Sequence, residues 1–207
     1  MYKIITTCLL IALGCCIYSC SSNKNNEIHQ QLVANKEKTA DGTILFFGHG
    51  YIAAPNLPEK HTLSEQIQTM VDSLALPYTC VQAGISGETS LDSKRRLEWA
   101  MESYEVDIIL IEAGRNDLKA NIPLIATEET LENMILQIKK AYPSVPIYLL
   151  STPINTTMGL LYHKLAQKHQ ISLIPCLTET PEINISNSKM VKEQVWKVLE
   201  KVLHSNT

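Results

Sequence analysis

The sequence has no excess of positive charge and no basic run interleaved with aromatic residues. Its 18 lysine and arginine residues stand against 21 aspartate and glutamate residues, which gives a formal net charge of -3. A nucleic-acid-binding surface needs a basic patch, often with aromatic side chains, to contact phosphates and bases. We therefore expect no nucleic-acid partner.

Cysteine and histidine are also scarce, and they are not spaced as metal ligands. The chain has 6 cysteines and 6 histidines, with no C-x-x-C motif and no paired Cys/His pattern. The sequence therefore predicts no metal site and no cofactor. Cys80 and Cys176 lie within or just after apolar runs, where an unpaired cysteine behaves as a small hydrophobic residue, and we predict no disulfide.

No internal repeat and no second domain is visible in the sequence. The 207 residues, 45% of them hydrophobic and 19% charged, have the composition of an ordinary globular protein. A chain of this length can bury one sizeable core. We expect a single globular domain over residues 42–207.

The first 19 residues are interpreted as a lipoprotein signal peptide. Lys3 precedes an apolar stretch from Ile4 to Ile17, which is too short to span a membrane as a stable helix. The order Ile17-Tyr18-Ser19-Cys20 resembles the lipobox of bacterial lipoproteins, in which the cysteine is acylated and begins the mature chain. The resemblance implies lipidation at Cys20.

A polar segment, rich in asparagine and lysine, follows the predicted lipidation site. Residues 20–41 have no apolar periodicity and are predicted to form a flexible tether. The protein is then expected to be exported and held on a bacterial membrane, in the cell envelope, through a lipid anchor only. Cys15 and Cys16 are competing lipidation sites, and a plain secretory signal cleaved nearby is the alternative.

Continuous apolar runs alternate with helical patterns through the rest of the chain. Continuous hydrophobicity predicts strands covered on both faces, as in a parallel sheet between helices. Thr62 to Glu65 matches a capping box at the start of the first helix. The pattern predicts an α/β fold, a flavodoxin-like three-layer αβα sandwich with a five-stranded parallel sheet. The strand runs are 44–47, 78–81, 108–111, 147–150 and 171–174, and the helical stripes lie within 63–74, 97–104, 131–138, 160–165 and 191–202.

Three segments that follow predicted strands carry a family resemblance. They are Ile44–Tyr51 (ILFFGHGY), Gln82–Ser90 (QAGISGETS) and Ile109–Asp117 (ILIEAGRND), and Tyr162–Leu177 adds a fourth. In order and spacing they resemble the SGNH (GDSL) hydrolases, in particular the lysophospholipase and arylesterase branch. The resemblance implies the SGNH hydrolase fold and an ancestry among carboxylic-ester hydrolases.

In that family a serine at the end of the first segment attacks an ester, and a histidine three residues after an aspartate acts as its base. Gly50 stands in the place of that serine, and His49 in the place of the aspartate before it. On the last loop Glu182 aligns with the family aspartate and Ile185 with the histidine, and no Asp-x-x-His occurs anywhere in the chain. The resemblance therefore implies that no catalytic residue is intact.

The positions that hold the oxyanion in the family are present. Gly87 and Asn116 match two donors, and Gly50 retains its backbone N–H as a third. Donors without an attacking group favour binding of a small ester, an acylated glycan or a carboxylate. Arg115 favours an anionic ligand, with His49 as a further contact, or else Arg115 forms a surface ion pair.

Two other hypotheses remain open from the sequence. An active ester hydrolase with a relocated nucleophile or base would use the hydroxyl of Ser86, Thr89 or Ser90, with His49 as base or nucleophile. Their structural alternatives are a turn at Ser86, a helix N-cap at Ser90 and a hydrogen-bonded loop residue at His49. The remaining hypothesis is a degenerate domain retained for partner contacts.

Overall fold

A computed structural model of the chain describes residues 42–177 and 183–205. The predicted signal peptide (1–19), the predicted lipidation site Cys20 and the predicted tether (20–41) lie outside the described residues. Glu182, the position aligned with the family aspartate, also lies outside them.

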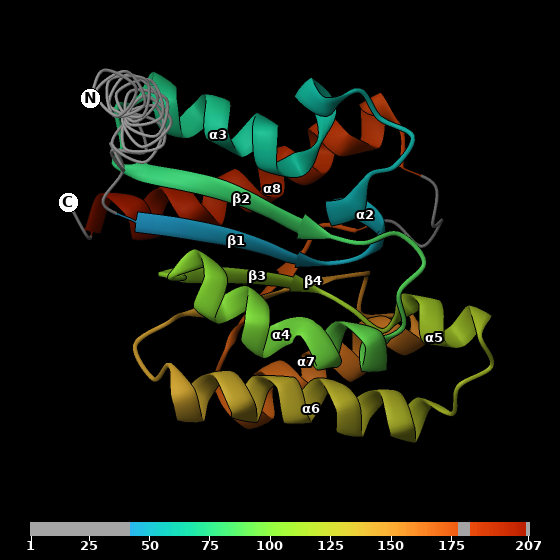
Figure 1. Cartoon of the computed structure of the whole chain (residues 1–207). Coiled ribbons are helices and arrows are strands. Elements are labelled where there is room, and N and C mark those ends of the chain that lie inside the picture. The colour runs from blue at the N-terminus through green and yellow to red at the C-terminus, as the bar shows by residue number, and fades with distance from the viewer. Residues whose placement is uncertain (1–41, 178–182, 206–207) are drawn as a thin grey trace, which may run out of the picture. The chain divides into compact units, whose positions relative to one another are not determined.

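A single parallel sheet of five strands forms the middle layer (Figure 1). Neighbouring strands pair in the order β2-β1-β3-β4-β5, so the chain order reverses beside β1. In such sheets the carboxyl ends of the strands on either side of the reversal form a ligand-binding crevice. The strands are β1 (Gly42–Gly48), β2 (Tyr78–Gly84), β3 (Ile108–Glu112), β4 (Ile147–Ser151) and β5 (Ser172–Pro175).

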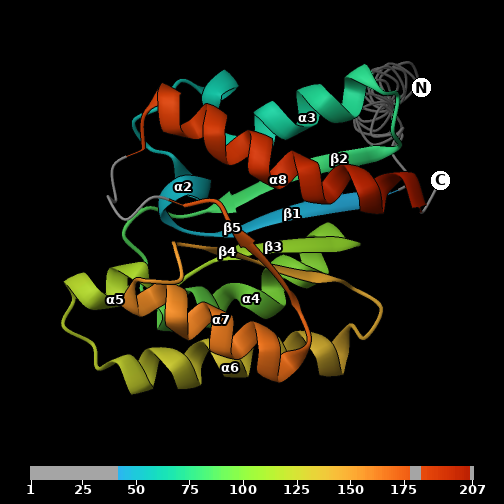
Figure 2. The same ribbon diagram turned by 180° about the vertical axis from the view of Figure 1, so that it is seen from behind.

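Helices cover both faces of this sheet, which confirms the predicted three-layer αβα architecture (Figures 1 and 2). On one face lie α3 (Leu63–Ser73) and α8 (Ile185–Ser205). On the other lie α4 (Ser90–Tyr104), α6 (Leu124–Ala141) and α7 (Thr157–His169). Shorter elements are α2 (Gly50–Ala53), the 3₁₀ helix η1 (Glu59–His61) and α5 (Arg115–Lys119).

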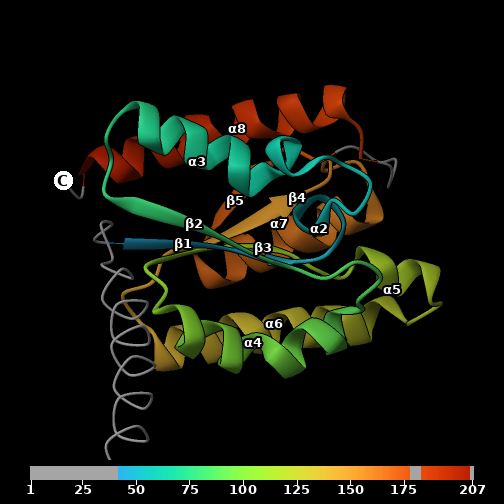
Figure 3. The ribbon, with the colours of Figure 1, turned by 45° about the horizontal axis from the view of Figure 1, so that its top comes forward.

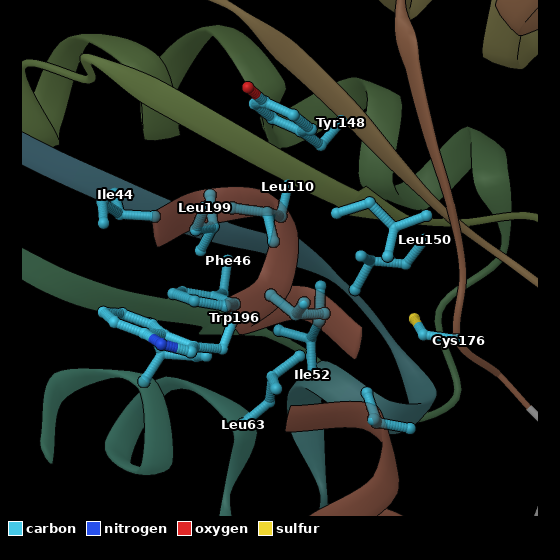
Figure 4. Packing of buried hydrophobic residues seen from close by; sticks show 14 of the residues in the cluster. Ile44, Phe46, Ile52, Leu63, Leu110, Tyr148, Leu150, Cys176, Trp196 and Leu199 are labelled. Carbon is cyan, nitrogen blue, oxygen red and sulfur yellow. The ribbon is translucent and has the colours of Figure 1, made fainter. Parts of the chain in front are cut away.

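Side chains along each strand alternate between two buried clusters. Ile44 and Phe46 point into the cluster under α3 and α8, whereas Leu45 and Phe47 point into the cluster under α4, α6 and α7. All four side chains are fully buried. Figure 4 shows the first cluster, where Phe46 of β1 lies near Trp196 of α8. Because both sheet faces are covered, the central strands β1, β3 and β4 are buried along their whole length, whereas the edge strands β2 and β5 are partly exposed.

Two predicted helix caps differ from the structure. Thr62 is the N-cap of α3, but its hydroxyl donates to the carbonyl oxygen of Glu59 at 2.8 Å and makes no capping bond. The preceding 3₁₀ turn brings that carbonyl within reach. Ser90 is not the N-cap of α4: Thr89 takes that place in a capping box with Asp92. Asp92 lies three residues after Thr89, which is the spacing a capping box requires.

The described residues contain two free cysteines, Cys80 and Cys176. Burial raises the pKa of both thiols, so neither is a reactive thiolate at neutral pH. Among the helices of the described ranges, none has the length and apolar composition needed to cross a membrane.

Candidate functional site

The three glycine-containing segments meet at the carboxyl ends of β1, β2 and β3. Gly48 pairs in register with Gly84 on one side and with Glu112 on the other. The loops that follow these strands lead into α2, α4 and α5, and α2 and α5 lie at the same end of the sheet (Figure 3). The structure therefore brings the sequence-predicted residues His49, Gly50, Gly87 and Asn116 to one edge of the sheet.

Gly50 cannot carry a side chain in this conformation without displacing Glu112. Its φ is +45, in the left-handed region that favours glycine. A Cβ atom at position 50 would lie 2.5 Å from Oε1 of Glu112. The carboxyl group of Glu112 therefore occupies the space into which a serine side chain at this position would project.

Glu112 is fully buried, and its two carboxyl oxygens have different partners. Oε2 accepts hydrogen bonds from the backbone N–H groups of Tyr51, at 2.7 Å, and Ile52, at 3.2 Å. Oε1 accepts from Nη1 of Arg115 at 3.3 Å. Because the first N–H groups of a helix lack intrahelical acceptors, Glu112 acts as the cap of the short α2.

Glu112 is not among the site residues predicted from the sequence. An acidic residue at the end of an uninterrupted apolar strand is the signal that marks it. Burial raises the pKa of its carboxyl group to about 7, although Arg115 and the two backbone donors act in the opposite direction. Glu112 therefore exchanges a proton near neutral pH.

His49 lies beside Glu112 and is 1% exposed. Neither ring nitrogen has a hydrogen-bond partner among the described residues. Nδ1 is 3.9 Å from Oε1 of Glu112, which is too far for a hydrogen bond. The sequence-based alternative, that His49 is a hydrogen-bonded loop residue, is therefore wrong for the described part of the chain.

The charge of His49 follows from its surroundings. Burial lowers its pKa to about 4, helped by the positive charges of Arg115 and Lys119 and opposed by Asp117. The imidazole is therefore neutral at pH 7, with one nitrogen able to donate and the other able to accept.

The loop between β2 and α4 contains Gly87, and we call residues 85–89 the glycine loop. Glu88 holds this loop in place. The carbonyl oxygen of Glu88 accepts a hydrogen bond from Nδ2 of Asn116 at 2.9 Å. Its carboxylate pairs with Arg96, whose Nε lies 2.6 Å from Oε1 and whose Nη2 also donates to the carbonyl of Gly48. Gly87 has a φ of +84 and faces open space. Arg96 and Asn116 thus fix the loop whose backbone N–H the family resemblance assigns to oxyanion binding.

Two of the candidate hydroxyls are engaged in structural hydrogen bonds. Thr89 Oγ1 lies 2.6 Å from Asp92 Oδ2 as part of the α4 cap. Ser90 Oγ donates to Asp117 Oδ2 at 2.5 Å, and Asp117 also accepts from the Thr127 hydroxyl at 2.8 Å. Asp117 is fully buried, so it ties α4, α5 and α6 together below the site.

Two adjoining cavities open at this edge of the sheet and share Gly50, Asn116 and Lys119. We call them the arginine cavity, of about 370 Å³, and the glycine cavity, of about 530 Å³. The arginine cavity is also lined by His49, Glu112, Arg115, Leu118, Thr152, Thr156, Thr157 and Met158. The glycine cavity is also lined by Pro55, Asn56, Ser86, Gly87 and Ile183.

Arg115 lines the arginine cavity with only 11% of its side chain exposed. The expected alternative of a surface ion pair is therefore wrong: Arg115 does pair with a carboxylate, but that carboxylate is buried Glu112. Its guanidinium also lies 5.5 Å from the centre of the Tyr51 ring.

Ile185, the position aligned with the family histidine, lines neither cavity. It is the first residue of α8 and is 54% exposed, while Ile183 lines the glycine cavity. Within the described ranges, no group of three or more His, Cys, Asp or Glu side chains is placed to hold a metal ion.

A family model and individual relatives of known function point to the same family. The model of the GDSL-like lipase/acylhydrolase family matches residues 47–185. An arylesterase of Vibrio mimicus is 29% identical over 146 residues, which cover 68% of this chain and 73% of the relative. The thioesterase 1/protease 1/lysophospholipase L1 of Escherichia coli is 28% identical over 105 residues, 48% of this chain and half the length of that relative.

Solved structures share the fold. The psychrotrophic esterase EstA from Pseudoalteromonas sp. superposes with a TM-score of 0.67 at 21% sequence identity, covering 79% of this chain and 100% of that chain. At this level of identity the likeness concerns the fold, and it confirms the predicted SGNH hydrolase architecture.

The raised pKa of Glu112 predicts a pH dependence of stability that Glu112→Gln removes. Below pH 4.5 the carboxyl is protonated in both the folded and the unfolded chain. Between pH 4.5 and 7 only the unfolded chain ionises it, so wild type loses stability relative to the variant as pH rises. We expect a relative slope of about 1.4 kcal/mol per pH unit, which levels off above pH 7.

Urea unfolding at closely spaced pH values measures this difference. Glu193→Gln, at an exposed position on α8, controls for the loss of one acidic side chain and should follow wild type. Wild type gaining stability relative to Glu112→Gln between pH 4.5 and 7 would contradict a raised pKa.

Proposed function

This chain belongs to the GDSL-like lipase/acylhydrolase family, and on that premise we propose that it binds a small ester, acylated glycan or carboxylate ligand without cleaving it. The observation that carries the proposal is the arrangement of Gly50 and Glu112. The position where the resemblance puts the nucleophile has no hydroxyl, and a buried carboxyl group fills the space beside it.

Nucleophilic ester cleavage needs a hydroxyl within hydrogen-bond reach of a base. The imidazole nearest to Gly50 is His49, and neither of its nitrogens contacts a hydroxyl in the described structure. Thr89 and Ser90 donate to Asp92 and Asp117 instead. These contacts support binding without cleavage.

The groups that favour binding are donors on three residues that line one cavity. Gly50, Gly87 and Asn116 line the glycine cavity, the first two with a backbone N–H and the third with a side-chain amide as donor. One N–H of the Asn116 amide donates to Glu88, which orients the side chain toward the glycine loop. A carbonyl or carboxylate oxygen is the acceptor that such donors suit.

An active ester hydrolase with a relocated nucleophile or base is the second candidate. The observation that favours it is the pair His49 and Glu112, a neutral imidazole whose Nδ1 is 3.9 Å from a carboxyl with a pKa of about 7. Groups that exchange protons near neutral pH suit general acid–base catalysis. In this candidate a water molecule or Ser86 takes the place of the missing nucleophile.

The proposal predicts no hydrolysis of short-chain aryl esters above background by the wild-type protein. Gly50→Ser should also be inactive, because its side chain meets Glu112 and its φ is strained, and should unfold with about 1–3 kcal/mol less stability. Adding Ile185→His should not restore turnover, since position 185 lines neither cavity. Release of the aryl alcohol and urea unfolding are the two measurements.

Gly50→Ala is the matched control, because it has the same strain as Gly50→Ser without the hydroxyl. Wild-type turnover that His49→Ala abolishes while the fold stays intact would favour the second candidate and sink the first.

We further propose that the protein is exported and anchored to a bacterial membrane by lipid on Cys20. The sequence around Cys20 supports this, with an apolar stretch before it and a polar segment after it. In a bacterial host that expresses the full chain with labelled palmitate, wild type should incorporate label and Cys20→Ala should lose it. Cys16→Ala should keep the label. Label that persists in Cys20→Ala, or a mature chain without any label, contradicts the anchor.

A further inference from the structure

The arginine cavity has features that binding at the oxyanion positions does not use. It shares Gly50, Asn116 and Lys119 with the glycine cavity, but Ser86 and Gly87 do not line it, and it has its own set of charged and polar groups. Four features favour a negatively charged ligand: two cations on α5, the imidazole of His49 and the N-terminus of α7.

Arg115 and Lys119 bring two positive charges to the cavity. They are four residues apart on α5, so they lie on the same side of the helix. The guanidinium of Arg115 is held by Glu112 at 3.3 Å and is largely buried, which presets its direction. Lys119 lines both cavities.

His49 adds a buried polar group without a partner. It is 1% exposed, lines the cavity, and has no hydrogen bond at either nitrogen within the described chain. A buried polar group normally has a partner, because burial without one is costly. A ligand oxygen that accepts from the neutral ring would supply that partner.

The N-terminus of α7 also lines the cavity. Thr156 is its N-cap, and Thr156, Thr157 and Met158 all line the cavity. The first N–H groups of a 13-residue helix have no intrahelical acceptors and carry partial positive charge, and here the Thr156 hydroxyl accepts from the N–H of Gly159 at 2.9 Å. Such a terminus favours a carboxylate or phosphate.

From this arrangement we infer that the arginine cavity binds the carboxylate of a small organic acid, with Arg115, Lys119 and His49 as its contacts. The inference rests on the proposed binding function, because the ligand would share the cleft beside Asn116. It adds the chemical class of the ligand, a carboxylate, and the cavity that holds the carboxylate group.

Glu112 decides between a carboxylate and a phosphate. Its carboxyl group lines the same cavity and is fully buried. A doubly charged phosphate would meet stronger repulsion from this carboxyl group than a singly charged carboxylate would. The cavity volume of about 370 Å³ and the apolar side chains of Leu118 and Met158 suit an acid with a short alkyl chain.

Titration of the purified chain with butyrate, followed by calorimetry and by the histidine NMR signals, tests the inference. Butyramide and methyl butyrate are neutral compounds of nearly the same shape, and inorganic phosphate is the competing anion. Butyrate should bind at least 10-fold more tightly than butyramide or phosphate, and it should shift the His49 resonance.

Variants at the two cations locate the site. Arg115→Gln should weaken butyrate binding by roughly 10-fold or more, and Lys119→Gln by roughly 3-fold. Lys140→Gln, an exposed change on α6, should have no effect. If Arg115→Gln fails to fold, butyrate binding by Lys119→Gln still tests the site, because Lys119 is exposed and its replacement should leave the fold intact.

Each outcome separates this inference from the proposed function. Equal binding of butyrate and butyramide, tighter binding of phosphate, or no change in Lys119→Gln overturns the carboxylate site. Methyl butyrate that binds without being cleaved while butyrate does not bind overturns this inference alone. Cleavage of methyl butyrate overturns the proposed function.

Discussion

The buried carboxyl group of Glu112 is the contact on which the rest of the site depends. It lies at the end of β3, caps α2 through Tyr51 and Ile52, and holds the guanidinium of Arg115. The same group limits position 50 to glycine, because it fills the space of a side chain there. Removing a partner of a buried carboxylate is costly, so these positions constrain one another. The absence of a serine at position 50 is therefore part of a packed arrangement.

Most of the fold follows from the hydrophobic pattern. Runs such as Ile44–Phe47 have no polar alternation because Phe46 and Phe47 point into different cores. That pattern identifies a parallel sheet covered on both faces. The predicted start of α3 at Thr62 is confirmed, but its capping box does not form, because the Thr62 hydroxyl donates to Glu59 in the preceding turn. The cap of α4 lies one residue before the predicted Ser90, because Asp92 forms the capping box with Thr89. Several residues in a row are individually able to cap, and only backbone geometry chooses among them.

The site residues that could be predicted are those that directly follow a predicted strand. His49, Gly50, Gly87 and Asn116 follow predicted strands, and parallel pairing brings them to one edge. Glu112 and the N-terminus of α7 were not foreseen, since their roles arise from the pairing of β3 with its neighbours and from the path of the β4–α7 loop. Ligand contact by Arg115 stays a prediction; the residue lines the arginine cavity, and its buried partner Glu112 is visible only in three dimensions.

Family membership does not determine the chemistry of this site. The chain has the fold and motif blocks of the GDSL-like lipase/acylhydrolase family, yet the site is occupied by a carboxyl group and a neutral imidazole where the resemblance expects a nucleophile and its partners. The most direct measurement is the intact mass of the folded protein after incubation with a fluorophosphonate probe, beside an active serine esterase as positive control. The account predicts an unchanged mass for this protein and a labelled control. A stoichiometric adduct on any side chain of the cleft would contradict it.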